Sequence, residues 1–134
     1  MSLETTVVQV EGPVSITVLA LDGELDASNF EGLIDEVRRL YDGGARQLLI
    51  DLADLRFMAS SGLVALHSIV RIMHGEPPPD PEAGWSALHA DMGGRQTEVQ
   101  LCAPQPAVER VLSRTGLDRL FVVHPDRDTA LAAV

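Results

Sequence analysis

The sequence predicts an α/β domain with a mixed, mostly parallel sheet of four to five strands flanked by about four helices. Two observations predict it. Apolar runs of strand length alternate along the chain with apolar stripes of helical period. The resulting order is strand, strand, helix, strand, helix, strand, helix, strand, helix, and right-handed crossovers make most of these strands parallel. A length of 134 residues suits one such domain, residues 1–134.

The first two strands are expected to form a hairpin. Residues 5–10 alternate loosely between apolar and polar side chains, and residues 14–21 are rich in β-branched side chains. The Glu-Gly-Pro sequence at residues 11–13 is typical of the turn between two such strands.

The first helix is predicted to begin near Ser28. Glu31 follows Ser28 by three residues, which is the spacing of a capping box, where each side chain satisfies an unpaired amide. Apolar residues then recur three and four apart and form one buried stripe: Phe30, Leu33, Ile34, Val37, Leu40 and Tyr41. The glycines at positions 43 and 44 predict the end of this helix.

The remaining strands and helices follow in alternation. Residues 48–50 form an apolar run without alternation, as expected for a central strand covered on both faces. A second helix follows the Ser-Ser-Gly sequence at 60–62, and its apolar residues occupy more than one stripe, so it should be more buried than the first. Residues 99–103 and 121–123 are strand candidates, Pro106 suits the first turn of a third helix, and residues 126–133 close the chain.

A proline-rich stretch from Gly75 to Thr97 is predicted to be an inserted loop, since its prolines and glycines interrupt regular structure. Within it, Trp85, Leu88 and Met92 have helical spacing and define a small apolar face. This face either packs back onto its own domain or forms a surface for a partner or a homodimer.

The charge of the chain favours a protein partner. A formal net charge of −10 repels nucleic acid phosphates and anionic lipids, so neither direct nucleic acid binding nor membrane binding is expected. No apolar run reaches membrane-spanning length, and the N-terminus shows no secretion signal. With a lone cysteine, Cys102, these features indicate the cytoplasm.

Catalysis, metals and cofactors are not expected. Cys102 sits in an apolar strand pattern that is typical of an inert, buried thiol. His67 and His74 are seven apart, whereas a helical metal pair needs a spacing of three or four. The serines at 60 and 61 lack the preceding glycine of a hydrolase nucleophile elbow, and no lysine is present to complete a phosphate-binding loop. The pattern therefore favours a binding protein.

Three short stretches carry a family resemblance. They are Gly-Glu-Leu-Asp at 23–26 after a strand, Leu-Ile-Asp-Leu at 49–52 in a central strand, and Phe-Met-Ala-Ser-Ser-Gly-Leu at 57–63 opening a helix. Their order and spacing resemble the STAS family, and within it the bacterial anti-sigma factor antagonists. The similarity covers nearly the whole chain outside residues 75–97, and its most specific part is the Ser-Ser-Gly-Leu helix start.

The resemblance implies a partner switch. The unmodified domain would bind an anti-sigma factor that is also a serine kinase, and so free a sigma factor. The kinase would phosphorylate the first serine of the motif, Ser60, and a metal-dependent PP2C-type phosphatase would remove the phosphate. Asp26, Ser60, Ser61 and Gly62 would form the partner-binding surface. Each has a structural alternative, because serine and aspartate are common at helix starts and the glycine can be a backbone requirement.

One position departs from the family pattern. An aspartate usually precedes the modified serine, and this chain has Ala59. Two interpretations follow: Ser60 is phosphorylated by a kinase adapted to alanine, or the switch has been weakened or lost. The second would make the chain a non-phosphorylated STAS scaffold, or a ligand-sensing or transporter-associated binding module.

Overall fold

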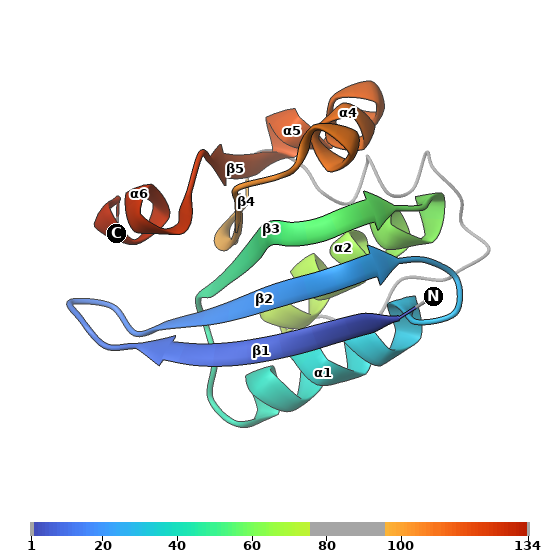
Figure 1. Cartoon of the computed structure of the whole chain (residues 1–134). Helices are drawn as coiled ribbons and strands as arrows, with labels where there is room; N and C mark the ends of the chain where they lie inside the picture. The colour runs from blue at the N-terminus through green and yellow to red at the C-terminus, as the bar shows by residue number, and fades with distance from the viewer. Residues whose placement is uncertain (1, 76–95, 134) are drawn as a thin grey trace.

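One mixed sheet holds the five strands of the described part of the chain, residues 2–75 and 96–133 of a computed structural model. The strands lie side by side in chain order (Figure 1): β1 (Leu3–Val10), β2 (Ile16–Leu25), β3 (Leu48–Met58), β4 (Gln96–Cys102) and β5 (Phe121–His124). β1 pairs with β2 in antiparallel fashion, and every later pair is parallel. The predicted hairpin and the mostly parallel sheet are confirmed.

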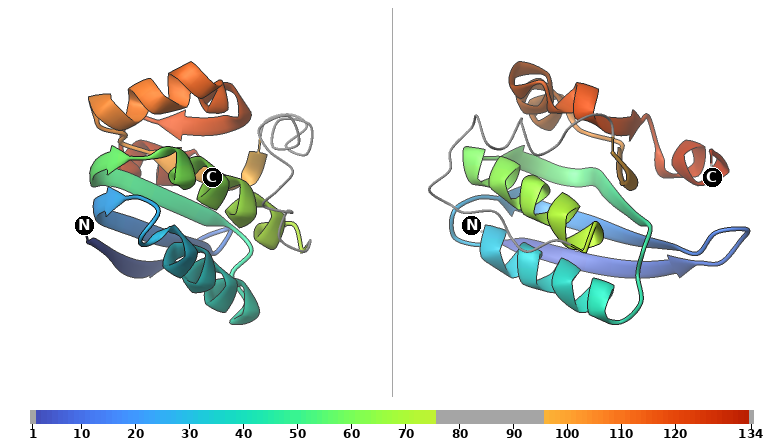
Figure 2. Two further views of the ribbon diagram at one scale, coloured as in Figure 1. Left: turned by 90° about the vertical axis from the view of Figure 1, so that its right-hand side faces the viewer. Right: turned by 180° about the vertical axis from the view of Figure 1, so that it is seen from behind.

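Most of the helices share one face of the sheet. The described helices are α1 (Phe30–Asp42), α2 (Ser60–Met73), α4 (Pro106–Thr115), α5 (Leu117–Leu120) and α6 (Arg127–Ala132). α1 and α2 pack against each other behind β1, β2 and β3, as the two views of Figure 2 show. Residues from α1, α2, α4 and α5 join one core cluster, whereas Ala130 of α6 belongs to a second.

The two clusters lie on opposite faces of the sheet. Leu19 belongs to the large cluster and its neighbour Val18 to the small one, which follows from the alternation of side chains along a strand. The small cluster takes Ile16, Val18 and Leu49 from the amino-terminal halves of β2 and β3. Among the described residues, no helix covers the carboxyl-terminal halves of these strands on that face, which Figure 1 views directly. A half-open face of the sheet results.

The start of α1 corrects one prediction. The helix begins at Phe30 with Asn29 as its N-cap, so Glu31 is the second helical residue and the predicted capping box does not form. The Ser28 hydroxyl donates instead to Asp26 Oδ1, 2.5 Å away. The capping box does not form because Ser28 lies one residue before the N-cap, Asn29, and Glu31 is therefore not the third residue of the helix.

Other elements match the predictions with shifted ends. α1 ends at Asp42 before Gly43, and α4 runs from Pro106 to a left-handed Gly116, as predicted. α2 is the more buried of the two long helices. The short helix α5 was not predicted. The expected loop at 75–97 ends earlier, because β4 begins at Gln96, and the Trp85, Leu88 and Met92 face lies outside the described residues.

Candidate functional site

The carboxyl ends of β2 and β3 bring the predicted site residues to one edge of the sheet. Leu25 and Met58 are the last pair in the parallel register, and the Ala59 amide donates to the Leu25 carbonyl at 2.9 Å. Asp26 follows the end of β2, and Ser60 follows the end of β3 by two residues. Asp26 therefore lies at the same sheet edge as the start of α2.

The two serines at the start of α2 differ sharply in exposure. Ala59 is the N-cap, with extended backbone dihedral angles, and no side chain caps this end of the helix. Ser60 is the first helical residue and is exposed. The Ser61 hydroxyl is buried and has no hydrogen-bond partner among the described residues. Neither serine is the cap residue, and only Ser60 presents its side chain to solvent.

Gly62 allows α2 to begin directly against the two strands. A Cβ at this position would lie 2.3 Å from Met58 Cγ and 3.1 Å from Leu25 Cδ2, both in the core. Since real Cβ atoms do not approach other atoms so closely, a side chain here would require the buried Met58 side chain or the helix start to shift. Gly62 thus fits its structural interpretation, and it fixes the position of Ser60 relative to the sheet edge.

Asp26 organises the turn between β2 and α1. Its carboxylate accepts hydrogen bonds from the Ser28 hydroxyl and from the Ser28 amide at 2.9 Å. The two bonds lower the pKa of Asp26 below its ordinary value, the hydroxyl contributing most. Asn29 closes the turn, accepting from the Asp26 amide and donating to the Glu24 carbonyl. Asp26 therefore serves the helix start and also places a negative charge at this edge.

Sequence reasoning missed the irregular course of β3. Leu21 of β2 faces two residues of β3, and a second extra residue, Arg56, is inserted between the partners of Gly23 and Glu24. These two β-bulges turn adjacent residue pairs to solvent, Ala53 with Asp54 and Arg56 with Phe57, while Leu55 and Met58 stay buried. Bulges often occur beside functional sites, where they redirect side chains.

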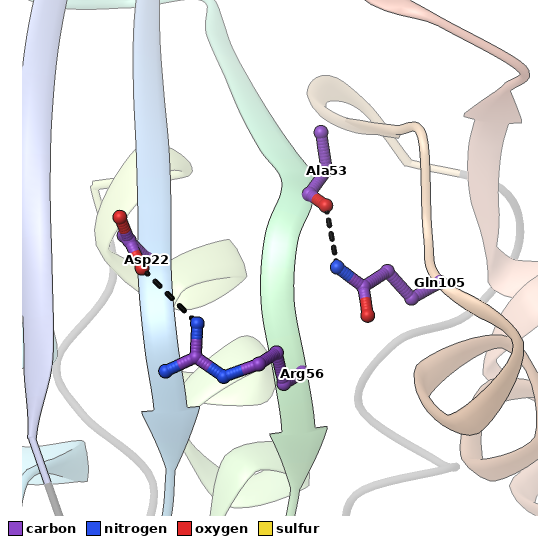
Figure 3. Close-up of polar contacts among 4 residues, drawn as sticks. All are labelled: Asp22, Ala53, Arg56 and Gln105. Atoms are coloured by element: carbon purple, nitrogen blue, oxygen red, sulfur yellow. Dashed lines mark hydrogen bonds and ion pairs between the residues drawn. The ribbon is translucent and has the colours of Figure 1, made fainter.

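Polar contacts cross the open face at these bulges (Figure 3). Arg56 and Asp22 form an exposed ion pair at 3.5 Å between β3 and β2. The Gln105 side chain, just before α4, donates to the Ala53 carbonyl at 2.7 Å. The first contact is solvent-screened and adds little stability. The second reaches β3 just beyond the end of its pairing with β4, which stops at Asp51.

A partly buried ion pair joins α6 to β3 beside the small core cluster. Asp51 is 8% exposed and accepts from Arg127 Nε at 2.9 Å and from the Ala53 amide at 3.0 Å. Cys102 lies in the same cluster and is fully buried. Burial, followed by the charge of Asp51, raises the pKa of the Cys102 thiol to about 12. This thiol stays protonated near neutral pH, in agreement with the prediction of an unreactive cysteine.

His67, His74 and a surface depression lie away from this sheet edge. Within residues 2–75 and 96–133, no group of three or more histidine, cysteine or acidic side chains is arranged to hold a metal ion. His67 is buried in α2, and His74 Nε2 lies 3.1 Å from Glu98 Oε2. No helix in these two described ranges is long and apolar enough to cross a membrane. A depression of about 660 Å³ lies at the opposite end of the domain, between the β1–β2 hairpin and the end of α1.

Comparison with known families and structures agrees with this architecture. The STAS domain family model matches residues 7–74, which is just over half of the chain. An anti-sigma factor antagonist from Mycobacterium paratuberculosis is 27% identical, with a TM-score of 0.70 and coverage of 99% of this chain and 94% of that chain.

Two further structures share the fold. The unphosphorylated form of SpoIIAA, a Bacillus anti-sigma factor antagonist, is 21% identical with a TM-score of 0.68 and coverage of 97% of this chain and 95% of that chain. The STAS domain of a SulP transporter from Vibrio cholerae is 18% identical with a TM-score of 0.54, covering 88% of this chain and 77% of that chain. At these identities the likeness establishes the fold alone.

Proposed function

Because this chain belongs to the STAS domain family, we propose that it is a cytoplasmic anti-sigma factor antagonist that acts by binding and not by catalysis. It binds an anti-sigma factor that is also a serine kinase and so releases a sigma factor. The similarity to the Mycobacterium paratuberculosis antagonist along nearly the whole chain supports this role. The observation that carries the proposal is the exposed Ser60 side chain at the edge where β2 and β3 end.

Ser60 is suited to reversible phosphorylation. Its exposure leaves the hydroxyl accessible to a kinase, whereas the buried Ser61 hydroxyl is not. The first amides of a helix lack intrahelical partners and lie at the positive end of the helix dipole. A phosphate carrying about −1.5 to −2 charges is favoured there, so the domain can accept the modification without unfolding.

The same phosphate should remove the domain from its partner. Burying an uncompensated dianion at an interface costs several kcal/mol, and each ~1.4 kcal/mol is tenfold in affinity. The lowered pKa of Asp26 keeps that carboxylate ionised on the same sheet edge, so the phosphate adds charge to a surface that is already negative. A loss of ~4 kcal/mol would weaken binding about a thousandfold. A PP2C-type phosphatase would restore the binding form.

Intact-mass spectrometry tests the modification directly. The chain is incubated with ATP and a cognate anti-sigma kinase. We expect a single added phosphate on the wild type and on Ser61→Ala, and none on Ser60→Ala. The Ser61→Ala variant is the matched control, because it removes the neighbouring hydroxyl that the structure buries. An unmodified wild-type chain, with a kinase that is active on another substrate, would contradict the proposed switch.

Binding is measured separately by isothermal titration calorimetry with the same anti-sigma factor. The unmodified chain should bind, and Ser60→Asp should weaken the complex by at least about tenfold, since it places a charge at a position that the partner covers in the proposed complex. Ser60→Asp binding as tightly as the wild type would show that Ser60 lies outside the interface.

Ala59 favours a second candidate function. As the N-cap it has no side-chain acceptor, so the helix start lacks the carboxylate that usually precedes the modified serine. Under this alternative the domain is a non-phosphorylated scaffold, or a ligand-sensing or transporter-associated binding module. Binding to the anti-sigma factor without any phosphorylation of Ser60 would support the scaffold. No binding to the anti-sigma factor would favour the ligand-sensing or transporter-associated modules.

A further inference from the structure

We propose that the partner surface extends from the α2 start onto the bulged end of β3, where Phe57 anchors the same anti-sigma factor. This inference rests on the proposed function. Phe57 is the first residue of the stretch at 57–63, and its role as an anchor is inferred from how β3 pairs with β2 near their carboxyl ends and from the exposure of its side chain.

The second β-bulge is what exposes Phe57. In a regular strand the side chains alternate, so a buried Leu55 predicts an exposed Arg56, a buried Phe57 and an exposed Met58. The inserted Arg56 shifts this pattern, and Met58 becomes buried while Phe57 turns to solvent with 43% of its surface exposed. An aromatic side chain that could join the core is instead held at the surface by an irregularity of the backbone.

Phe57 stands out among the exposed apolar side chains. In the described residues the large exposed ones are Val7, Val8, Val14 and Phe57, and Phe57 is the only aromatic among them. It precedes Ser60 by three residues, so their Cα atoms are no more than about 11 Å apart. Ser60 and Phe57 are therefore close enough for one interface to cover both, and buried aromatic residues commonly dominate interface energies.

The charges around Phe57 favour a partner of opposite sign. Asp54 is exposed, Glu24 pairs with Phe57 across the strands, and the nearby cation Arg56 is already paired with Asp22. A second copy of this chain, whose net charge is −10, would be repelled. The partner is instead the anti-sigma factor, whose surface has an apolar pocket for Phe57 and basic residues facing Asp54. Phe57 lies between Asp54 and Ser60 along the chain, so the basic residues of the partner are separate from the part of the partner that meets Ser60.

Calorimetric titration of the purified anti-sigma factor tests the anchor. Phe57→Ala is compared with Val14→Ala, a matched control with the same 43% exposure on the hairpin at the opposite end of the sheet. We expect Phe57→Ala to weaken binding about thirtyfold, as the loss of an interface hot spot does, and Val14→Ala to stay within about twofold of wild type.

One outcome would overturn the inference and leave the proposed function standing. In it, Phe57→Ala binds the anti-sigma factor with a Kd within about twofold of wild type, while Ser60→Asp binds poorly. A wild-type chain that does not bind any anti-sigma factor would overturn both. Thermal melting of each variant checks that the fold is retained.

A second variant keeps the test decisive if Phe57→Ala does not fold. Asp54→Arg reverses one exposed charge beside the anchor, and Glu11→Arg makes the same reversal in the distant hairpin turn. We expect Asp54→Arg to slow association about tenfold or more at low salt, with Glu11→Arg changing it much less, because charges near an interface govern the encounter rate. Equal effects of the two reversals would show that only net charge matters and that the bulged surface is not the docking site.

Discussion

The two long helices of the amino-terminal half start in contrasting ways. α1 opens with Phe-Glu-Gly-Leu at residues 30–33 and α2 with Ser-Ser-Gly-Leu at 60–63, and both follow strands that end at the same sheet edge. Before α1, hydrogen bonds of Asp26, Ser28 and Asn29 close a turn. Before α2 there is no turn, and Ala59 caps the helix without a side-chain bond. The polar groups of the first start hold the fold together, whereas Ser60 of the second remains available to a partner.

The third residue of each helix shows the same contrast in packing. Gly32 has nothing within 4 Å of the position that a Cβ would take, whereas Gly62 is pressed against Met58 and Leu25. Gly32 faces away from the domain although the next residue, Leu33, is buried in the core, whereas Gly62 faces the strand ends. The glycine of the serine motif therefore sets where Ser60 lies.

The largest expected effect comes from adding one methyl group to each of these glycines. Gly62→Ala should destabilise the domain by about 1–3 kcal/mol, because the new Cβ overlaps the Met58 side chain. Gly32→Ala should stabilise it by about 0.5–1 kcal/mol, because alanine is the better helix former in open space. Urea unfolding measures both. Effects of equal sign and size would show that the two helix starts do not differ in packing.

Opening the turn before α1 should have the next largest effect. Asn29→Ala removes the bond from the Asp26 amide at 3.0 Å and the bond to the Glu24 carbonyl at 2.8 Å. The expected loss is about 1–2 kcal/mol, at roughly 1 kcal/mol per hydrogen bond. Asn29→Asp keeps the acceptor and loses the donor, so its unfolding free energy should fall between those of wild type and Asn29→Ala. A neutral Asn29→Ala would mean that the turn does not contribute to stability.

Much of the fold could be predicted because its signals are local. The stripe of α1, the glycines that end it and the broad burial of α2 depend on residues within each element. The capping box failed because three capping side chains, those of Asp26, Ser28 and Asn29, compete within four residues, and spacing alone does not rank them. The bulges of β3 depend on its register with β2, which no local pattern records.

The candidate site was predictable only in outline. That Asp26 and Ser60 share a sheet edge follows from the parallel order of the strands. Which serine is exposed depends on the residue at which β3 ends, and either serine fits a helix start by spacing. The exposure of Phe57 escaped prediction because an aromatic residue between Leu55 and Met58 is typical of a buried strand end.

A smaller effect should follow from giving α2 the side-chain cap that it lacks. Ala59→Asp should stabilise the domain by about 0.5–1 kcal/mol, because the carboxylate can accept from the first amides and interacts favourably with the helix dipole. Ala59→Asn is the control for charge: it can make the hydrogen bond without adding an anion beside Asp26. If both variants are less stable than wild type in thermal and urea unfolding, the start of α2 has no room for a capping side chain.

The smallest effect concerns stability at acid pH, and it arises from the Asp26 carboxylate in the turn before α1. Bonds from Ser28 lower the folded-state pKa of Asp26 below its ordinary value of 3.8. A carboxyl with a lowered pKa contributes stability above its unfolded pKa, and that contribution is lost as the pH falls through the folded pKa.

Ser28→Ala removes the hydroxyl bond, so it should raise the pKa of Asp26 and flatten the decline of unfolding free energy below about pH 4. The slope that remains belongs to other carboxyls such as Asp126, whose pKa is also lowered, by hydrogen bonds from Thr129. Carboxyl NMR titration of Asp26 in both proteins separates the two, and an unchanged Asp26 pKa in Ser28→Ala would show that the turn at α1 does not hold this charge.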